Sequence, residues 1–253
     1  MIDTHCHLTD TRLGSQLNFV LARAAAAGVH RMITIGTELV DDRLCLEVCR
    51  GRTNLACAVG VHPNYVDQVE PNDLGQLREI GADPSVVALG EMGLDYHYGK
   101  ETRQRQVEFF EFQLALAKEM NKPVIIHSRE AIDDCLGILR NHPIVRAVFH
   151  CFTGTLAESK KVLDAGYLLG FTGVITFKNS GELREAVKNC PSDRLLVETD
   201  APYLSPEPLR KQKVNEPALV MHVAAMVAQI RDLTVGEVDE LTTRNAETFF
   251  GTR

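Results

Sequence analysis

Long apolar runs are missing from this 253-residue chain. A helix that crosses a membrane needs about 18 consecutive apolar residues, and no stretch approaches that length. The sequence also shows no basic segment followed by an apolar one, so we expect neither a signal peptide nor a membrane anchor. These absences predict a cytoplasmic protein.

Cysteine pairs of the C-x-x-C type are absent as well, although the chain has 7 cysteines. In a chain without an export signal, an odd number of unclustered cysteines favours reduced thiols over a disulfide framework. Cys6 and Cys151 each adjoin a histidine, and we expect them to be small buried hydrophobic side chains.

The chain also lacks an excess of basic residues, since its formal net charge is −7. This charge excludes a protein that coats nucleic acid through a broad basic face, but it leaves room for a nuclease with a small basic patch. No linker divides the chain, so we expect one domain over residues 1–253. The sequence leaves the oligomeric state open, and a monomer is compatible with it.

Eight short β-rich runs alternate with longer helical patterns. The runs are residues 2–7, 31–36, 55–62, 86–94, 123–129, 146–152, 167–174 and 195–200. Most are almost continuously apolar, which is typical of strands buried on both faces of a parallel sheet. Eight units of this kind are the number that closes a (β/α)₈, TIM-like barrel. An open doubly wound sheet is the rival, but the turn after the first run lacks the glycines of such folds.

Helix signals separate several of these runs. Residues 17–27 and 156–165 form helical patterns that end at Gly28 and Gly166, as helices often do. Residues 103–120 carry apolar side chains at helical spacing. Thr234 and Glu237 fit a capping box that opens a last helix.

Imidazole or carboxylate side chains are expected to end most of the strand-like runs. They are His5, His7, His62, Glu91, His127, His150 and Asp200. In a closed barrel the carboxyl ends of all strands meet at one face, which holds the active site. These residue types suit Zn²⁺ or another divalent metal, such as Mg²⁺ or Mn²⁺. The pattern predicts a metal site at the carboxyl ends of the strands.

The number of ligands is sufficient for two ions. His5, His7 and Asp200 form one ligand set, in which His5 and His7 share a strand face. His127 and His150 form another, with Glu91 as a bridge. Taken singly, His127 and His150 fit hydrogen-bonded core positions better than ligand positions, and Glu91 also fits an ion pair. Two histidines at equivalent positions on successive strands favour ligands instead.

Two ions about 3.5–4 Å apart would clamp a phosphodiester, whereas one ion would suffice for an ester or amide. Asp200 and Glu91 are the candidate catalytic carboxylates, acting on a metal-activated water. Asp3 and Glu198 are interpreted as supporting residues rather than ligands.

These segments resemble the TatD family of metal-dependent deoxyribonucleases, within the amidohydrolase superfamily. The matching stretches are residues 2–7, 60–63, 90–96, 123–129, 150–154, 198–203 and 215–217, and they span the chain in the family's order. The resemblance implies a TIM-like barrel, one or two divalent metals and hydrolysis of DNA. By position it implies ligand roles for His5, His7, Glu91, His127, His150 and Asp200. It assigns His62 to the substrate phosphate or the site wall.

Basic residues near these segments are candidates for binding the substrate. Arg210 and Lys211 lie where the family often has an Arg-Gly-Lys stretch; here the charge is kept but the glycine is not. They could neutralise phosphates or form a solvated loop. Arg129 follows His127 closely and is a candidate phosphate clamp. The aromatic residues Tyr96, Phe152 and Tyr203 are candidates for stacking on bases or for packing.

Two enzymatic hypotheses follow. The first is a metal-dependent deoxyribonuclease with a DNA substrate. The alternative is a metal-dependent ester or amide hydrolase that acts on a small molecule or an aminoacyl-nucleic acid. A non-enzymatic barrel that only binds a ligand or a partner protein is disfavoured, because such a protein would not need six potential metal-ligating residues.

Overall fold

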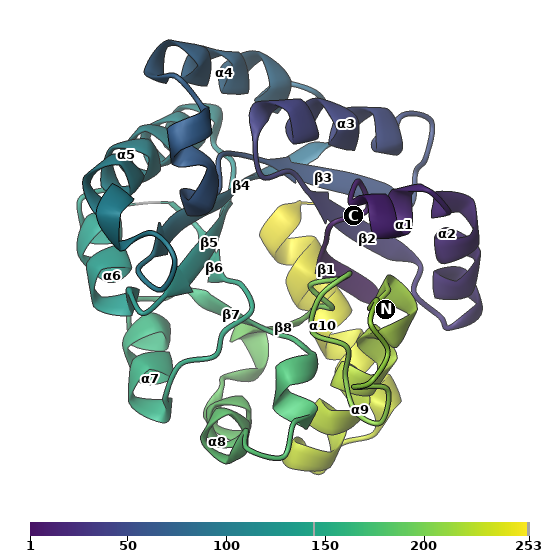
Figure 1. Ribbon diagram of the computed structural model, residues 1–253. Helices are drawn as coiled ribbons and strands as arrows, with labels where there is room; N and C mark the ends of the chain where they lie inside the picture. Colours follow the sequence, from purple (N-terminus) through teal and green to yellow (C-terminus); the bar gives the residue numbers. More distant parts are fainter. Residues whose placement is uncertain (144, 252–253) are drawn as a thin grey trace. The chain divides into compact units, whose positions relative to one another are not determined.

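The computed structural model describes residues 1–143 and 145–251. Within these residues, eight strands alternate with helices and follow their chain order in the sheet, from β1 to β8 (Figure 1). This is the order of the expected (β/α)₈ fold. The residues pack as two compact units, which are Met1–Thr34 with Cys151–Arg253 (unit 1) and Ile35–His150 (unit 2). The single domain over residues 1–253 stays a prediction.

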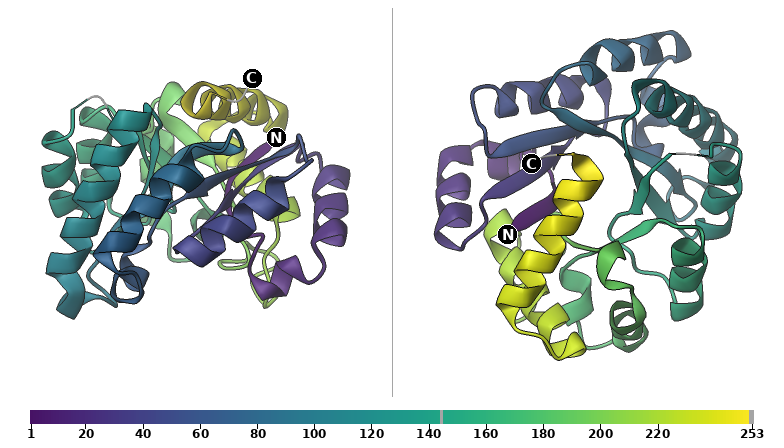
Figure 2. Two further views of the ribbon diagram at one scale, coloured as in Figure 1. Left: turned by 90° about the horizontal axis from the view of Figure 1, so that it is seen from above. Right: turned by 180° about the vertical axis from the view of Figure 1, so that it is seen from behind.

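Unit 1 combines the two ends of the chain. Its elements are β1 (Ile2–Cys6), α1 (Thr11–Gly14), α2 (Leu17–Ala26), β2 (Arg31–Ile35), α7 (Leu156–Asp164), β7 (Leu168–Phe171), η4 (Gly173–Thr176), α8 (Gly181–Asn189), η5 (Ser192–Arg194), β8 (Leu195–Val197), η6 (Pro217–Leu219), α9 (Val220–Arg231) and α10 (Val235–Phe250). Within it β1 pairs with β2 and β7 with β8, both in parallel. Figure 2 shows α10, in yellow, beside the purple first strand, where the Met1 amine lies 3.1 Å from an Asp239 carboxylate oxygen.

Unit 2 is a run of parallel strands with helices packed on them. Its elements are α3 (Leu39–Cys49), β3 (Leu55–Val59), η1 (Pro63–Gln68), η2 (Pro71–Gly75), α4 (Gln76–Gly81), β4 (Val86–Asp95), η3 (Lys100–Thr102), α5 (Arg103–Met120), β5 (Val124–Arg129), α6 (Ile132–Arg140) and β6 (Ala147–Phe149). Helix α3 packs on β3, α5 on β4 and α6 on β5. The apolar run Val124, Ile125 and Ile126 is buried, as expected for a strand covered on both faces.

Several strands are shorter than the sequence predicts. Strand β3 ends at Val59, β7 at Phe171 and β8 at Val197, and Gly173–Thr176 forms η4 instead of extending β7. Beyond β3 the backbone is satisfied by side chains, since Asp42 accepts the Gly60 N–H and Gln113 accepts the Val61 N–H. His62, His150 and Asp200 therefore lie in loops just past their strands, whereas Glu91 lies inside β4.

The predicted helix signals agree with the structure. Helix α5 has the predicted bounds, and Gly28 and Gly166 follow α2 and α7 with φ of 87° and 86°. Thr234 and Glu237 form the predicted capping box of α10. Among the described residues, no single helix is long and apolar enough to cross a membrane. One pair of helices is long and apolar enough only when the two are taken together. The pair is Pro217–Arg231 and Val235–Phe250, with a bend of 108° between them.

Candidate metal centre

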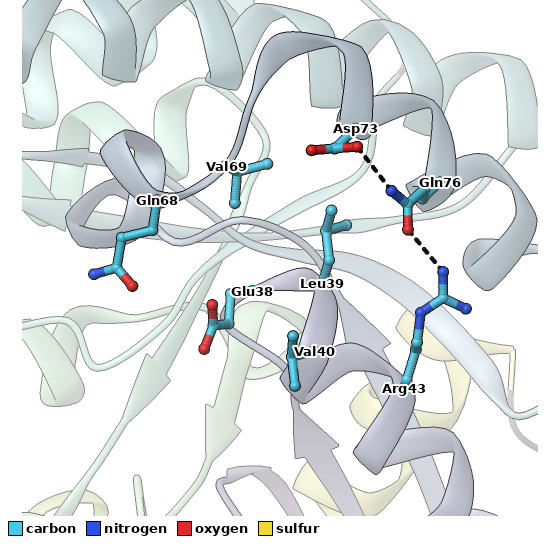
Figure 3. Close-up of a pocket in the computed structure, with 8 residues that line it drawn as sticks. All are labelled: Glu38, Leu39, Val40, Arg43, Gln68, Val69, Asp73 and Gln76. Carbon is cyan, nitrogen blue, oxygen red and sulfur yellow. Dashed lines mark hydrogen bonds between the residues drawn. The ribbon is translucent and has the colours of Figure 1, made fainter.

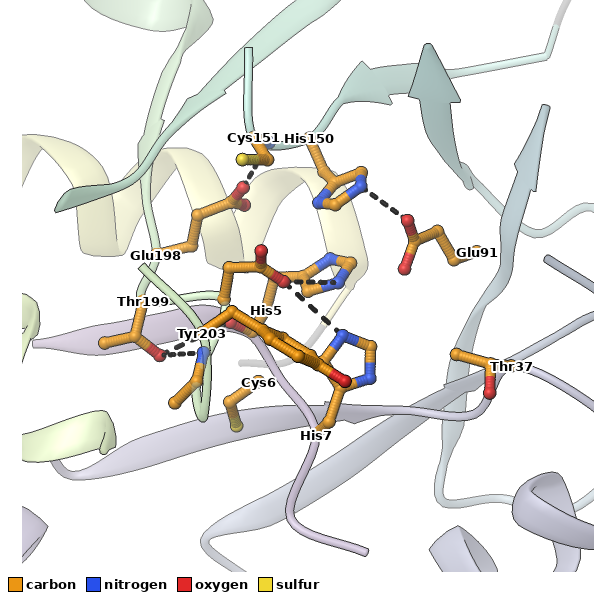
Figure 4. Close-up of polar contacts among 12 residues, drawn as sticks. His5, Cys6, His7, Thr37, Glu91, His150, Cys151, Glu198, Thr199 and Tyr203 are labelled. Atoms are coloured by element: carbon orange, nitrogen blue, oxygen red, sulfur yellow. Dashed lines mark hydrogen bonds and ion pairs between the residues drawn. The ribbon is translucent and has the colours of Figure 1, made fainter. Parts of the chain in front are cut away.

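The first cation group consists of His5, His7 and Asp200, all in unit 1. The Asp200 Oδ1 atom lies 3.8 Å from His5 Nε2 and 3.4 Å from His7 Nε2. The two imidazole rings meet edge to face, with centroids 5.1 Å apart, and Figure 4 shows both side chains. One atom from each residue can therefore contact the same ion.

Backbone pairing beyond β8 brings these three residues together. The Asp200 N–H donates to the His5 carbonyl, at 2.9 Å, and the His7 N–H donates to the Ala201 carbonyl, at 2.7 Å. Asp200 has φ of 55°, in the left-handed region that aspartate tolerates better than most residues. Residues almost 200 positions apart are thus fixed by two neighbouring hydrogen bonds.

Two buried carboxylates lie behind this group. Asp3 accepts hydrogen bonds from the Thr199 N–H and hydroxyl, at 2.9 and 2.6 Å. Burial raises the pKa of Asp3 to about 7, against the opposing effect of these hydrogen bonds. Glu198 accepts from the Cys151 N–H at 2.5 Å and from the Thr4 hydroxyl at 3.3 Å. Asp3 and Glu198 thus bind protein donors, and their supporting roles stay predictions.

The second cation group consists of His62, Glu91, His127 and His150, all in unit 2. Three imidazole nitrogens surround one carboxylate oxygen, Glu91 Oε1. The distances are 2.6 Å from His150 Nε2, 2.7 Å from His127 Nδ1 and 3.3 Å from His62 Nε2. Figure 4 shows the contact between Glu91 and His150.

His62 and His127, in the second group, differ in which ring nitrogen donates a hydrogen bond and which can accept one. His62 Nδ1 accepts the Asn64 N–H at 3.0 Å, so the proton of a neutral ring lies on Nε2 and faces Glu91. His127 Nε2 lies 3.2 Å from Asp95 and its Nδ1 lies 2.7 Å from Glu91, so a protonated ring donates to both carboxylates. If Nδ1 loses its proton, Asp95 keeps the Nε2–H and Nδ1 gains a lone pair. Hence His127 can ligate an ion through Nδ1, whereas His62 is a hydrogen-bond donor.

Electrostatics in this group favour a positive charge beside Glu91. Burial opposes ionisation of Glu91, but the charges of His150 and His62 and a hydrogen bond from His127 hold its pKa well below the ordinary range. Burial lowers the pKa of His62. Burial also opposes a charge on His127, yet hydrogen bonds to Asp95 and Glu91 raise its pKa.

The donors present fit a divalent cation. Each group offers nitrogen and oxygen atoms close enough to contact one ion, and the ligand types are those preferred by Zn²⁺ and related metals. A cation would supply the positive charge that the buried Glu91 carboxylate requires. The structure thus indicates a divalent metal.

Asp95 is a functional candidate that was not predicted as a site residue. It ends β4, and its buried carboxylate accepts the N–H groups of His97 and Tyr98, both at 2.9 Å. These bonds and the one from His127 hold its pKa below the ordinary range against the effect of burial. Period-2 alternation from Glu91 was the available signal, since both side chains share a strand face.

The predicted substrate-binding residues have partners of their own. Arg129 stacks on the Tyr98 ring, 4.6 Å from its centroid, and Arg210 stacks on Phe177 at 4.0 Å. Lys211 is exposed in the loop after Pro208. Their contacts with a phosphate stay predictions.

The candidate stacking residues differ in exposure. Phe152 is buried against Phe171, which favours packing. Tyr96 donates its hydroxyl to Asp134 at 2.7 Å, whereas Tyr203 is exposed. Of the three, Tyr203 keeps the most open ring.

A separate surface hollow lies at the start of α3 (Figure 3). It is lined by Glu38, Leu39, Val40, Arg43, Gln68, Val69, Asp73 and Gln76. Its polar side chains bind one another, because Gln76 joins Asp73 at 3.0 Å to Arg43 at 2.8 Å. None of the predicted site residues lines this hollow.

The structure thus divides the predicted ligands into two groups, one in each unit. Their convergence on a single centre, with Glu91 as a bridge, stays a prediction, as do the individual ligand and catalytic roles.

Comparison with known proteins gives consistent matches over the whole chain. The family model described as TatD related DNase matches residues 2–251. The chain is 41% identical over 255 residues to the uncharacterized metal-dependent hydrolase YcfH of Escherichia coli strain K12, covering 99% of the chain and 95% of that protein. It is 37% identical over 257 residues to the 3′-5′ ssDNA/RNA exonuclease TatD of Klebsiella pneumoniae strain 342, covering 99% and 98%.

A solved structure confirms the fold. The crystal structure of YJJV, a TatD homologue from Escherichia coli K12, superposes with a TM-score of 0.94 at 31% identity, covering 99% of this chain and 98% of that one. The expected (β/α)₈ barrel class is therefore correct.

Proposed function

Since the chain belongs to the TatD related DNase family, we propose that it is a divalent-metal-dependent deoxyribonuclease that hydrolyses phosphodiester bonds. The observation that carries the proposal is the second cation group, where three imidazole nitrogens surround the buried Glu91 carboxylate. An assembly of this kind is costly to bury unless a cation is bound.

Each cation group is proposed to hold one ion of Mg²⁺, Mn²⁺ or Zn²⁺. His5, His7 and Asp200 would hold the first ion, and Glu91, His127 and His150 the second. A bound ion would activate water and stabilise the charge on the phosphate oxygens. Both groups lie at or near the carboxyl ends of strands, where barrels of this class carry their active sites.

The chain's own residues supply orientation and proton transfer. The Asp200 carboxylate is the proposed acceptor for the proton of the attacking water, because Asp200 combines ligand chemistry with partial exposure. Glu91 holds the imidazoles of the second group in place. The His62 Nε2–H, whose position is set by the Asn64 N–H, is proposed to donate to a phosphate oxygen in exchange for its contact with Glu91. Arg129, Arg210 and Lys211 are proposed to neutralise further phosphates.

Relatives guide the choice of substrate and compartment. One relative is described as an exonuclease of single-stranded DNA and RNA, so a strand end of DNA is the proposed substrate here, with RNA as a second substrate to assay. The seven thiols are compatible with a reducing compartment, which supports a cytoplasmic protein.

The test begins with protein stripped by a chelator and reloaded with Mg²⁺, Mn²⁺ or Zn²⁺. Bound metal is measured by mass spectrometry, and cleavage is followed on end-labelled single-stranded DNA, duplex DNA and RNA. His127→Ala and Asp200→Ala should each lose metal, and each should lose more activity than the roughly 10- to 100-fold typical for an outer hydrogen-bond partner. His222→Ala, outside both groups, is the matched control.

Two results would contradict the proposal. Full nuclease activity in both alanine variants would exclude the two cation groups as the catalytic centre. Cleavage of model esters without cleavage of any nucleic acid would identify an ester hydrolase in place of a nuclease.

A further inference from the structure

An exposed aromatic ring lies directly beside the first cation group. Tyr203 follows Asp200 by three positions and is 47% exposed. Its ring meets the His7 ring edge to face, with centroids 6.0 Å apart and planes at 76° (Figure 4). The tyrosine thus contacts a proposed ligand with its ring and leaves much of its surface open to solvent.

Arg12 braces this ring. Its guanidinium carbon lies 4.6 Å from the Tyr203 ring centroid. Asp10 in turn holds the guanidinium through two hydrogen bonds, of 2.8 and 2.7 Å. The same carboxylate accepts the Arg12 backbone N–H at 2.9 Å and caps α1. Asp10 therefore holds the guanidinium in place over the ring.

The backbone of Tyr203 is also held. Its N–H donates to the Asp200 carbonyl at 2.9 Å. Its carbonyl accepts from the buried Asn215 side-chain amide at 2.6 Å, and the same amide donates to the Thr199 carbonyl at 2.9 Å. These bonds fix the tyrosine relative to the strand end that carries Asp200, so the ring is positioned before any ligand arrives.

We infer that Tyr203, braced by Arg12, is a stacking platform for an unpaired nucleobase next to the phosphate that is cut. A base–aromatic stack tolerates every base, because each base has a π face. A base inside a duplex is already stacked on both sides, so the platform selects single strands. This inference rests on the proposed nuclease function and adds the feature of the substrate that is recognised.

The charge of the chain supports this assignment. With a net charge of −7, general attraction for a polyanion is weak, and affinity must come from local contacts. The Arg12 charge is already paired with Asp10, so Arg12 contributes by holding the Tyr203 ring as a flat surface for a base. The cation group beside it provides the position of the phosphate.

The experiment compares Tyr203→Ala with Tyr203→Phe, which keeps the aromatic ring. Phe19→Ala is the matched control, since Phe19 is a 71% exposed aromatic residue on α2 and belongs to neither cation group. The first readout is quenching of 2-aminopurine at the 3′ end of a single-stranded oligonucleotide, with excess chelator present. The second is the ratio of kcat/KM for single-stranded over duplex DNA with Mn²⁺-loaded protein.

Tyr203→Ala should lose the quench and about tenfold in single-strand selectivity, in line with the stacking contribution of one base. Tyr203→Phe and Phe19→Ala should match the wild type. Equal selectivity and quenching in Tyr203→Ala and Tyr203→Phe would overturn the stacking role while leaving the nuclease intact. If the wild type cleaves no nucleic acid with any metal, the proposed function fails instead, and the quench alone decides whether the platform binds a base.

Discussion

Single residues in this chain are positioned by hydrogen bonds that also set their charge. His127 is an example, because Asp95 and Glu91 contact its two ring nitrogens at 3.2 and 2.7 Å. The Asp95 contact determines which nitrogen keeps its lone pair. A residue that contacts a metal-ligating side chain, but not the metal ion, can therefore control the affinity for the ion.

Asp95→Asn should weaken metal binding about 10- to 100-fold, since the amide is a poorer acceptor for the His127 Nε2–H. Competition with a chromophoric chelator measures the affinity directly. Asp193→Asn, an exposed carboxylate elsewhere in the chain, is the control. Equal metal affinity in Asp95→Asn and wild type would show that the contact does not orient His127 for binding.

Asp42 should make stability depend on pH. Burial raises its pKa well above 3.8, although its Oδ1 accepts the Gly60 N–H at 3.0 Å. The folded state keeps a proton that the unfolded chain has lost, so this contribution to stability is complete below the unfolded pKa and is lost as pH rises through the folded pKa.

Asp42→Asn keeps an acceptor for Gly60 and removes the titration. The free energy of unfolding should therefore fall less between pH 5 and pH 8 in the variant than in the wild type, as measured by urea denaturation at several pH values. An identical pH dependence in the two proteins would refute the buried protonated state.

At the scale of elements, α5 supports two strand ends through buried glutamines. Gln113 accepts the Val61 N–H at 2.8 Å and donates to the Val61 carbonyl at 3.1 Å. Gln106 makes the same pair of bonds with the backbone of Asp95, at 2.9 and 3.1 Å. One helix thus fixes the segment that leads to His62 and the end of β4 that carries Asp95.

Gln113→Leu should lower the free energy of unfolding by about 2 kcal/mol or more, because it leaves a buried N–H and a buried carbonyl without these partners. Gln104→Leu, at an exposed position on the same helix, should change stability far less. Chemical denaturation of both variants gives the comparison. Equal stability of the two would mean that water replaces the lost bonds.

At the scale of the whole molecule, the net charge of −7 makes binding of a polyanion depend on few contacts. Each phosphate contact on a single strand contributes about 0.7 to the slope of log affinity against log salt. Lys211→Gln should reduce that slope by about 0.7 when single-stranded DNA is titrated at several salt concentrations. Lys188→Gln on α8 is the control, and an unchanged slope in Lys211→Gln would remove Lys211 from the phosphate contacts.

The fold class followed from the sequence, because buried parallel strands are recognisable as repeated apolar runs. The strand ends were less predictable. Gly60 and Val61 continue the apolar run that predicted a strand over residues 55–62. Their N–H groups, however, donate to the Asp42 and Gln113 side chains and not to a neighbouring strand. Such side-chain partners come from distant helices and leave no local signal. Asp95 is different, because its alternation with Glu91 was a local signal, and only its contact with His127 on the next strand required the tertiary structure.

The sequence by itself determined the chemistry that is available: imidazoles and carboxylates placed in or just after apolar strands. Tertiary structure decided how these residues are grouped, since His7 meets Asp200 only through backbone bonds between β1 and the segment beyond β8. It also decided which ring nitrogen of His62 carries the proton, and it placed a carboxylate against each ring nitrogen of His127. The physical reason is that ligand type is a property of each side chain, whereas distance, burial and tautomer are set by neighbours that lie far away in the chain.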